Sequence, residues 1–327
     1  MDVSKRTIEF EMVSIGSITL RVAVAGTGPL VVLVHGFPES WHSWRHQISA
    51  LADAGYRVVA PDVRGYGGSS QPEAIDAYAM SELTADMAGL VDVFTPGEPA
   101  VIIGHDWGAP IAWHSALLHP DHFRAVAGLS VPHVPLGKRH ALDAAMKNFI
   151  DKGLFFYLHY FQEPGRAEKE LEGDVERAIK TMYYGWSGDA PKGYWHNRKA
   201  PDAKLLDEID PVPTPMPTWF SEEDAAYYIT EFERTGFRGA LNRYRNFDRD
   251  FALYNSLPSY VIEQPALFIG GTEDPALVMF PSDPTEAMKP VFRDLRGAHM
   301  LDGIGHWTQQ EAPDQVNRLL LSWLADL

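Results

Sequence analysis

The sequence predicts an α/β protein with a mostly parallel central sheet, helices on both faces of that sheet, and a helical segment inserted into the chain. Short runs that are apolar throughout suit strands buried on both faces of a parallel sheet. Helical patterns separate most of these runs, and this alternation is typical of right-handed strand–helix–strand units. The alternation stops in the middle of the chain and resumes later, which indicates the insertion.

The expected elements begin with a hairpin at one edge of the sheet. Residues 8–13 and 18–24 alternate apolar and polar side chains, with Gly16 between them. Five apolar runs are then expected as buried strands, at 30–34, 58–60, 101–103, 125–129 and 266–269. The clearest helical patterns lie at 43–54, 109–118 and 313–325.

The insertion divides the predicted core into two parts. We expect residues 1–133 and 256–327 to form the core, and residues 134–255 to form a helical lid rich in Tyr, Phe, Trp and Arg. Within the lid, four prolines at 211–217 forbid a helix and predict an extended connection.

Composition excludes several classes of function. The 327 residues are 45% hydrophobic and 22% charged, as in a folded globular protein, and their net charge of −16 argues against binding nucleic acid or anionic membranes. Cys is absent, and the 13 His show no metal-ligand spacing, so we expect no metal and no other cofactor. No apolar stretch approaches the ~18–20 residues of a membrane span, so a soluble cytoplasmic protein is expected. The oligomeric state stays open, with a homodimer as one option.

A glycine-flanked aspartate is the strongest chemical signal. The segment 104–108, Gly-His-Asp-Trp-Gly, follows an apolar run and precedes a helical pattern, which is the context of a nucleophile elbow. Backbone N–H groups and the helix dipole would keep Asp106 ionised there. Since a carboxylate needs no base to become a nucleophile, we expect Asp106 to attack a saturated carbon and form an alkyl ester. The plain alternative is a helix N-cap, where Asp is common.

A second motif supplies a candidate oxyanion hole. His-Gly-Phe-Pro at 35–38 directly follows the run 30–34, so a turn there can aim the N–H of Phe37 at the nucleophile. The N–H of Trp107 would be the second donor for the tetrahedral intermediate of ester hydrolysis. An ordinary turn after a strand is the alternative.

The general base and its acid are expected late in the chain. His306, in Gly-His-Trp after a strand, is preferred over His299, which we place within that strand. Asp274 follows the strand 266–269 and is expected to orient the histidine, with Glu273 as the neighbouring alternative. The order nucleophile, acid, histidine is the one expected of this arrangement.

Further motifs point to a family. They are Arg-Gly-Tyr-Gly-Gly-Ser-Ser at 64–70, Tyr-Phe-Gln-Glu-Pro-Gly at 160–165, Gly-Phe-Arg-Gly-Ala-Leu-Asn at 236–242 and Tyr-Arg-Asn at 244–246. With them the chain, from residue 10 to 324, resembles the epoxide hydrolases of the α/β-hydrolase fold, both bacterial ones and the hydrolase domain of mammalian soluble epoxide hydrolase.

The resemblance implies an activity and two more site residues. The family uses two lid tyrosines, which the match carries onto Tyr160 and Tyr244; phenols are suitable acids for the alkoxide that forms when an epoxide opens. The alternative is that both tyrosines only pack the aromatic lid. We expect hydrolysis of an epoxide to a vicinal diol, with Phe37, Trp107, Tyr160 and Tyr244 around an apolar or aromatic substrate.

Two other functions are weighed against this one. A haloalkane dehalogenase uses the same Asp nucleophile, and a Trp after it helps hold the halide, but this chain has Phe37 where a halide-binding Asn is expected. A fluoroacetate dehalogenase would need Arg at Trp107. A non-catalytic ligand-binding protein of the same fold would show a damaged triad, whereas all three members are present here.

Overall fold

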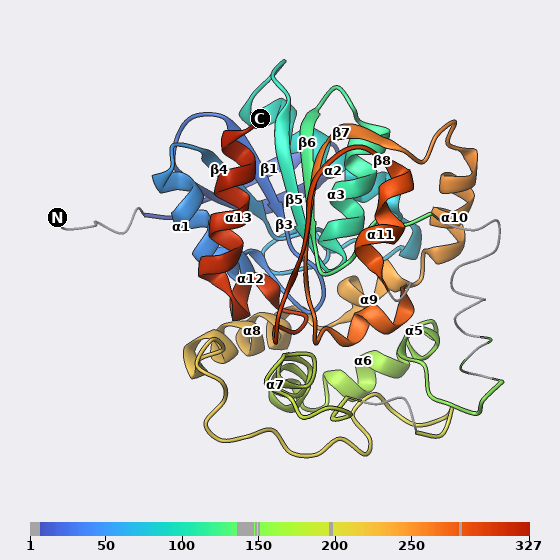
Figure 1. The fold of residues 1–327 in the computed structure, drawn as a ribbon. Coiled ribbons are helices and arrows are strands. Elements are labelled where there is room, and N and C mark those ends of the chain that lie inside the picture. Colours follow the sequence, from blue (N-terminus) through green and yellow to red (C-terminus); the bar gives the residue numbers. More distant parts are fainter. Residues whose placement is uncertain (1–6, 136–146, 148, 150, 196–198, 281–282) are drawn as a thin grey trace.

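The computed structural model describes residues 7–135, 147, 149, 151–195, 199–280 and 283–327. In this part of the chain eight strands form one sheet in the order β1-β2-β4-β3-β5-β6-β7-β8 (Figure 1). The strands are β1 (Glu9–Ile15), β2 (Ile18–Ala25), β3 (Leu30–Val34), β4 (Arg57–Pro61), β5 (Ala100–His105), β6 (Phe123–Leu129), β7 (Ile262–Gly271) and β8 (Phe292–Leu301). The predicted edge hairpin, β1 with β2, is antiparallel, and so is the pairing of β2 with β4, while the strands from β4 to β8 in this order pair in parallel. The predicted fold class is confirmed.

The central strands are apolar throughout because helices cover both of their faces. Alternate residues of β3 point to opposite sides, so Val31 and Leu33 join one hydrophobic cluster while Val32 and Val34 join another. The helices α1 (Arg45–Asp53) and α13 (Pro313–Ala325) cover the first side, and α2 (Met80–Phe94) and α3 (Gly108–Leu118) cover the second. The helix expected at 43–54 begins with a 3₁₀ turn, η1 (Trp41–Trp44), before α1.

Between β6 and β7, the described residues contain helices and no strand. Figure 1 shows α5 to α8 grouped beyond one end of the sheet, with α9 between them and the core and α10 beside it. Residues 211–217 are not helical, as the prolines predict. The helices are α5 (Tyr157–Tyr160), α6 (Arg166–Leu171), α7 (Val175–Gly185), α8 (Glu222–Thr235), α9 (Arg238–Tyr244) and α10 (Phe247–Ser256). We call this part the inserted segment; its bounds at 134 and 255 remain a prediction.

Short elements complete the described part of the chain. They are η2 (Ile75–Tyr78), η3 (Pro275–Met279), α11 (Pro284–Met288), η4 (Lys289–Val291) and α12 (Thr308–Glu311). Among the described residues, none of the helices has the length and apolar character needed to cross a membrane.

Polar contacts bind the inserted segment to the core. Arg21 of β2 forms an ion pair with Glu231 of α8 at 2.7 Å. Asp250 of α10, which is buried, accepts a hydrogen bond from the N–H of Met80 at the start of α2, at 2.9 Å. Because loss of the donor would leave the buried carboxylate of Asp250 without that partner, this contact in particular holds the segment over the carboxyl ends of the strands.

Candidate active site

Asp106 occupies a sharp turn between β5 and α3. Its φ of 50° lies in the left-handed region, which is costly for a residue with a Cβ. A Cβ at Gly104 would lie 1.8 Å from the carbonyl oxygen of Gly108, and one at Gly108 would lie 2.0 Å from that of Val34. Only glycines therefore allow the strand and the helix to approach closely enough for this turn, and the elbow predicted from the sequence is present.

The carboxylate of Asp106 is held by a backbone N–H group that follows β3. The N–H of Phe37 donates to its Oδ1 at 2.7 Å, as predicted. The N–H of Trp107, the other predicted donor, has no hydrogen-bond acceptor within the described residues. A Cβ at Gly36 would lie 2.3 Å from Asp106 Oδ1, so this close approach also requires glycine.

His306 joins the two carboxylates that were predicted to flank it. Its Nδ1 lies 3.0 Å from each carboxylate oxygen of Asp274, and its Nε2 lies 3.4 Å from Asp106 Oδ2. The alternative acid, Glu273, instead faces Lys192 at 3.7 Å. The alternative base, His299, lies exposed on β8. The structure therefore brings together Asp106, His306 and Asp274.

The charges of this triad stabilise one another. Burial opposes the charged form of each group, but the carboxylates of Asp274 and Asp106 raise the pKa of His306 well above its ordinary value. Burial likewise opposes ionisation of Asp106, yet the contact with His306 and the N–H of Phe37 bring its pKa below the ordinary range. The free site thus contains an ionised carboxylate beside a protonated histidine.

The two predicted tyrosines lie in different surroundings. Tyr244, at the end of α9, packs against Phe37 and Trp107 with ring centroids 5.4 and 5.2 Å apart. Burial, and then the charge of Asp106, raise its pKa, which keeps its hydroxyl protonated. Tyr160 instead donates its hydroxyl to Glu170 of α6 at 2.7 Å. Tyr160 lines neither of the cavities at Asp106, so the structure does not bring this predicted residue into the site.

Tyr157, one helical turn before Tyr160, takes the place that was assigned to Tyr160. It lines both cavities at Asp106, and its ring lies 6.3 Å from that of Tyr244. Burial, followed by the charge of Asp106, raises the pKa of its hydroxyl. The hydroxyl's protein neighbour is the thioether of Met279 at 3.8 Å, a weak acceptor. Its proton is therefore available to a substrate.

Trp186, just after α7, is another residue that the sequence analysis missed. Its ring meets that of His306 at 5.1 Å and that of Tyr157 at 5.6 Å. Its carbonyl oxygen accepts the N–H of His306 at 2.8 Å. Aromatic residues crowd the whole inserted segment, so no local pattern distinguishes this one.

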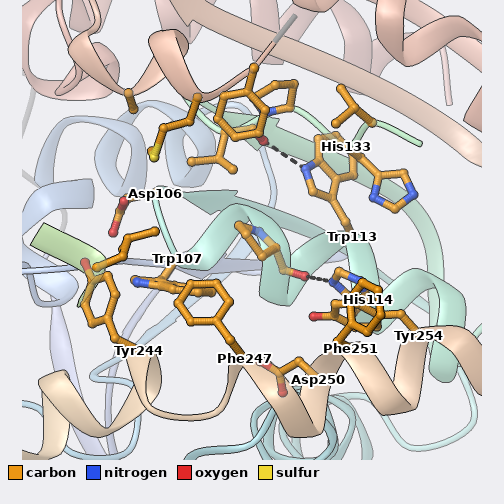
Figure 2. A pocket seen from close by; sticks show the side chains of 18 of the residues that line it. Asp106, Trp107, Trp113, His114, His133, Tyr244, Phe247, Asp250, Phe251 and Tyr254 are labelled. Carbon is orange, nitrogen blue, oxygen red and sulfur yellow. Dashed lines mark hydrogen bonds between the residues drawn. The ribbon is translucent and has the colours of Figure 1, made fainter. Parts of the chain in front are cut away.

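Two cavities of unequal size meet at Asp106. The larger, about 260 Å³, is lined mainly by aromatic and aliphatic side chains; Figure 2 shows Asp106, Trp107 and Tyr244 at one end of it and His114 and His133 at the other. The smaller, about 30 Å³, is lined by Phe37, Met182, Trp186, Leu205 and His306, among others. Asp106, Tyr157 and Tyr244 line both cavities.

The two histidines at the far end of the larger cavity are neutral. Burial lowers the pKa of His114 to about 3 and that of His133 to about 4, so both rings are neutral at physiological pH. Their rings stack on those of Tyr254 and Tyr260, with centroids 4.0 and 4.5 Å apart. This end of the cavity is suited to neutral, apolar groups.

Comparison with known proteins agrees with this geometry. The α/β hydrolase fold family matches residues 29–282. Epoxide hydrolase A of Mycobacterium tuberculosis is 46% identical over 97% of this chain and 97% of its own. The chain belongs to the epoxide hydrolases of the α/β-hydrolase fold. A solved epoxide hydrolase from an endophytic Streptomyces is 45% identical, covers 98% of this chain and 96% of its own, and superposes with a TM-score of 0.91.

The mammalian epoxide hydrolases are also similar to the chain. Bifunctional epoxide hydrolase 2 of Mus musculus is 39% identical over 94% of this chain, which spans 53% of that longer protein. The resemblance inferred from the motifs is therefore confirmed for both bacterial and mammalian epoxide hydrolases.

Proposed function

We propose that this protein opens an epoxide with the carboxylate of Asp106 and then hydrolyses the resulting ester to a vicinal diol. The observation that carries the proposal is the presence of two phenol hydroxyls, those of Tyr157 and Tyr244, in the same cavities as an ionised carboxylate. A carboxylate can attack a saturated carbon, and two O–H donors can hold the epoxide oxygen that must leave.

In the first step, Asp106 forms a bond to an epoxide carbon while the bond from that carbon to the ring oxygen breaks. Tyr157 and Tyr244 donate hydrogen bonds to the ring oxygen, and one of them transfers its proton to the developing alkoxide. The product is a hydroxyalkyl ester of Asp106 and a tyrosinate.

In the second step, His306 becomes a base because its surroundings have changed. Esterification removes the charge of Asp106, one of the two carboxylates that raise the pKa of His306, so the imidazolium gives up its proton more readily. That proton passes through solvent to the tyrosinate, which becomes a neutral tyrosine again. Neutral His306, oriented by Asp274, then takes a proton from water as that water attacks the ester carbonyl. The N–H groups of Phe37 and Trp107 stabilise the oxyanion.

Collapse of this intermediate releases the diol and restores the starting charges. The bond between the carbonyl carbon of Asp106 and the substrate oxygen breaks, and the leaving oxygen keeps the proton from the new carboxyl group. His306 keeps the proton that it took from water, so Asp106 is again a carboxylate, His306 an imidazolium and both tyrosines are protonated. The net reaction adds one water to the epoxide.

The smaller cavity has a suitable size and position for the hydrolytic water. A cavity needs a volume of about 10–15 Å³ to hold one water molecule, so a cavity of about 30 Å³ holds one or two. Of the two cavities, this is the one that His306 lines. We infer that water waits here while the substrate occupies the larger cavity.

The larger cavity favours a neutral, apolar or aromatic epoxide. Its aromatic walls and neutral histidines suit an uncharged substituent, and Asp250, which also lines it, is already paired with Arg243. Since α5, α9 and the residue after α7 supply Tyr157, Tyr244 and Trp186, we propose that the inserted segment is a lid that completes the site.

Diol formation from styrene oxide tests the proposal, with halide release from 1-chlorobutane as the parallel assay. We expect turnover of the epoxide and none of the chloroalkane, and loss of the epoxide activity in Asp106→Ala with the fold intact. Chloride release without diol formation would favour a dehalogenase. A folded Asp106→Ala variant that still forms the diol would reject the nucleophile.

A further inference from the structure

A carboxylate that the two chemical steps do not use lies beside the base. Glu311 is the last residue of α12, five positions after His306. Its Oε2 accepts the N–H groups of Gly188 and Gly305 at 2.8 and 2.9 Å, and its Oε1 accepts that of Trp307 at 2.9 Å. One side chain thus satisfies three backbone donors.

These donors come from both sides of the site. Gly305 and Trp307 precede and follow His306, whereas Gly188 belongs to the inserted segment just after α7. The N–H of His306 itself donates to the carbonyl oxygen of Trp186 in the same part of the inserted segment. The loop of residues 305–307 is therefore bound to the inserted segment in two ways: directly through the N–H of His306, and through Glu311, which binds the residues before and after His306.

The two backbones touch where Glu311 binds them. A Cβ at Gly305 would lie 2.3 Å from the nitrogen of Gly188, and a Cβ at Gly188 would lie 2.1 Å from the carbonyl oxygen of Gly303. Real Cβ contacts are not this short, so both positions require glycine. The close approach places N–H groups of two separate chain segments within reach of one oxygen atom.

We propose that Glu311 is a positioning residue that fixes His306 for hydrolysis of the alkyl-enzyme by tying the loop on both sides of the base to the inserted segment. The inference rests on the proposed function, because it concerns the second of its two steps.

The role depends on a carboxylate. An ionised carboxylate only accepts hydrogen bonds, so both oxygens of Glu311 can face N–H groups. A Gln side chain would replace one oxygen with an NH₂ group, which would point its own protons at a donor. Burial, together with the nearby charge of Asp274, raises the pKa of Glu311 to about 7, and the three N–H groups oppose this shift by stabilising the charge.

The effect should be confined to the second step. Alkylation depends on Asp106, held by the N–H of Phe37, and on Tyr157 and Tyr244 of α5 and α9; Glu311 hydrogen-bonds to none of these. Hydrolysis depends on the position of the His306 ring. A displacement of about 1 Å at a reacting group can slow a reaction about 100-fold.

The test compares Glu311→Gln with Glu170→Gln in single-turnover reactions with styrene oxide. Glu170 is a matched control: it accepts the N–H groups of Leu205 and Leu206, both at 2.9 Å, and the hydroxyl of Tyr160, all within the inserted segment. We expect Glu311→Gln to slow hydrolysis roughly 10- to 100-fold while alkylation changes less than about threefold. The ester should then accumulate in intact-protein mass spectra. Glu170→Gln should change neither rate.

A folded Glu311→Gln variant with a normal hydrolysis rate would overturn the proposal, and so would equal slowing of both steps. If circular dichroism shows that this variant does not fold, Glu311→Asp decides, because it keeps the charge and only shortens the reach by one methylene. Selective slowing of hydrolysis is again expected, and unchanged or uniformly slowed kinetics would again refute the inference. The wild-type enzyme distinguishes failure of the proposed function from failure of the Glu311 proposal. If the wild type forms no ester, the proposed function is wrong. If the wild type forms the ester but the Glu311 variants do not slow hydrolysis selectively, only the role of Glu311 is wrong.

Discussion

Removal of the hydroxyl from each tyrosine of α5 in turn should affect different properties: the rate of alkylation for Tyr157 and the stability of the fold for Tyr160. In Tyr157→Phe, the epoxide oxygen loses one of its two donors. Within the described residues, the wild-type hydroxyl has the thioether of Met279, at 3.8 Å, as its competing protein acceptor, so its hydrogen-bonding capacity is left largely to the substrate. A lost donor of the oxyanion-hole kind costs about 2–4 kcal/mol, or roughly a 30- to 900-fold slower alkylation.

Tyr160→Phe should behave in the opposite way. Its hydroxyl is committed to Glu170 at 2.7 Å, and a hydrogen bond to a charged group contributes about 1.5–3 kcal/mol to stability. This variant should therefore unfold at a lower temperature while its alkylation rate stays within about twofold of wild type.

Stopped-flow quenching of tryptophan fluorescence on mixing with excess epoxide measures alkylation, because Trp107 and Trp186 line the cavities. Thermal unfolding followed by circular dichroism measures stability. If Tyr160→Phe slows alkylation as much as Tyr157→Phe does, or if Tyr157→Phe leaves it unchanged, the assignment of donors from the structure is wrong.

Three further predictions follow from the triad. His306→Gln should still be alkylated but should not release diol, so intact-protein mass spectrometry should show an adduct of one substrate mass; rapid loss of that adduct would exclude His306 as the base. The His306 imidazolium should titrate well above its ordinary pKa in the wild type, and at a lower pH in Asp106→Ala, since that variant lacks one of the two carboxylates that stabilise the charge. Nuclear magnetic resonance of the ring would measure both titrations, and an unchanged titration in the variant would contradict the proposed activation of the base. Gly36→Ala places a Cβ 2.3 Å from Asp106 Oδ1, which should displace the N–H of Phe37. By analogy with a lost oxyanion donor, we expect turnover to fall at least roughly 10-fold. Normal steady-state kinetics would show that the turn tolerates the change.

Much of the core could be predicted from the sequence because its signals are local. The run 30–34 and the helical pattern 313–325 have the bounds of β3 and α13 in the structure. The nucleophile, base and acid each follow a strand, and parallel strands bring their carboxyl ends to one edge of a sheet. For the same reason, the proximity of Asp106, His306 and Asp274 was expected before any distance was known.

The inserted segment was less predictable because its contacts are long-range. Tyr157 and Tyr160 are three residues apart on one short helix, where side chains are neighbours, so the motif alone could not decide which one faces Asp106. The decision comes from Glu170, ten residues later, which binds the hydroxyl of Tyr160. Likewise, no sequence pattern links Glu311 to Gly188, because only the folded chain brings them together.

The central claim, a covalent ester on Asp106, is tested most directly by isotope labelling in a single turnover. Enzyme in excess over epoxide would react in ¹⁸O-water, and the masses of the diol and of the peptide containing Asp106 would be measured by mass spectrometry. Because the oxygen added to the substrate comes from the carboxylate, and water attacks the ester carbonyl, the diol should be almost unlabelled and the peptide should carry ¹⁸O. Full labelling of the diol in that first turnover, with none in the peptide, would mean that water attacks the epoxide directly and that Asp106 is not the nucleophile.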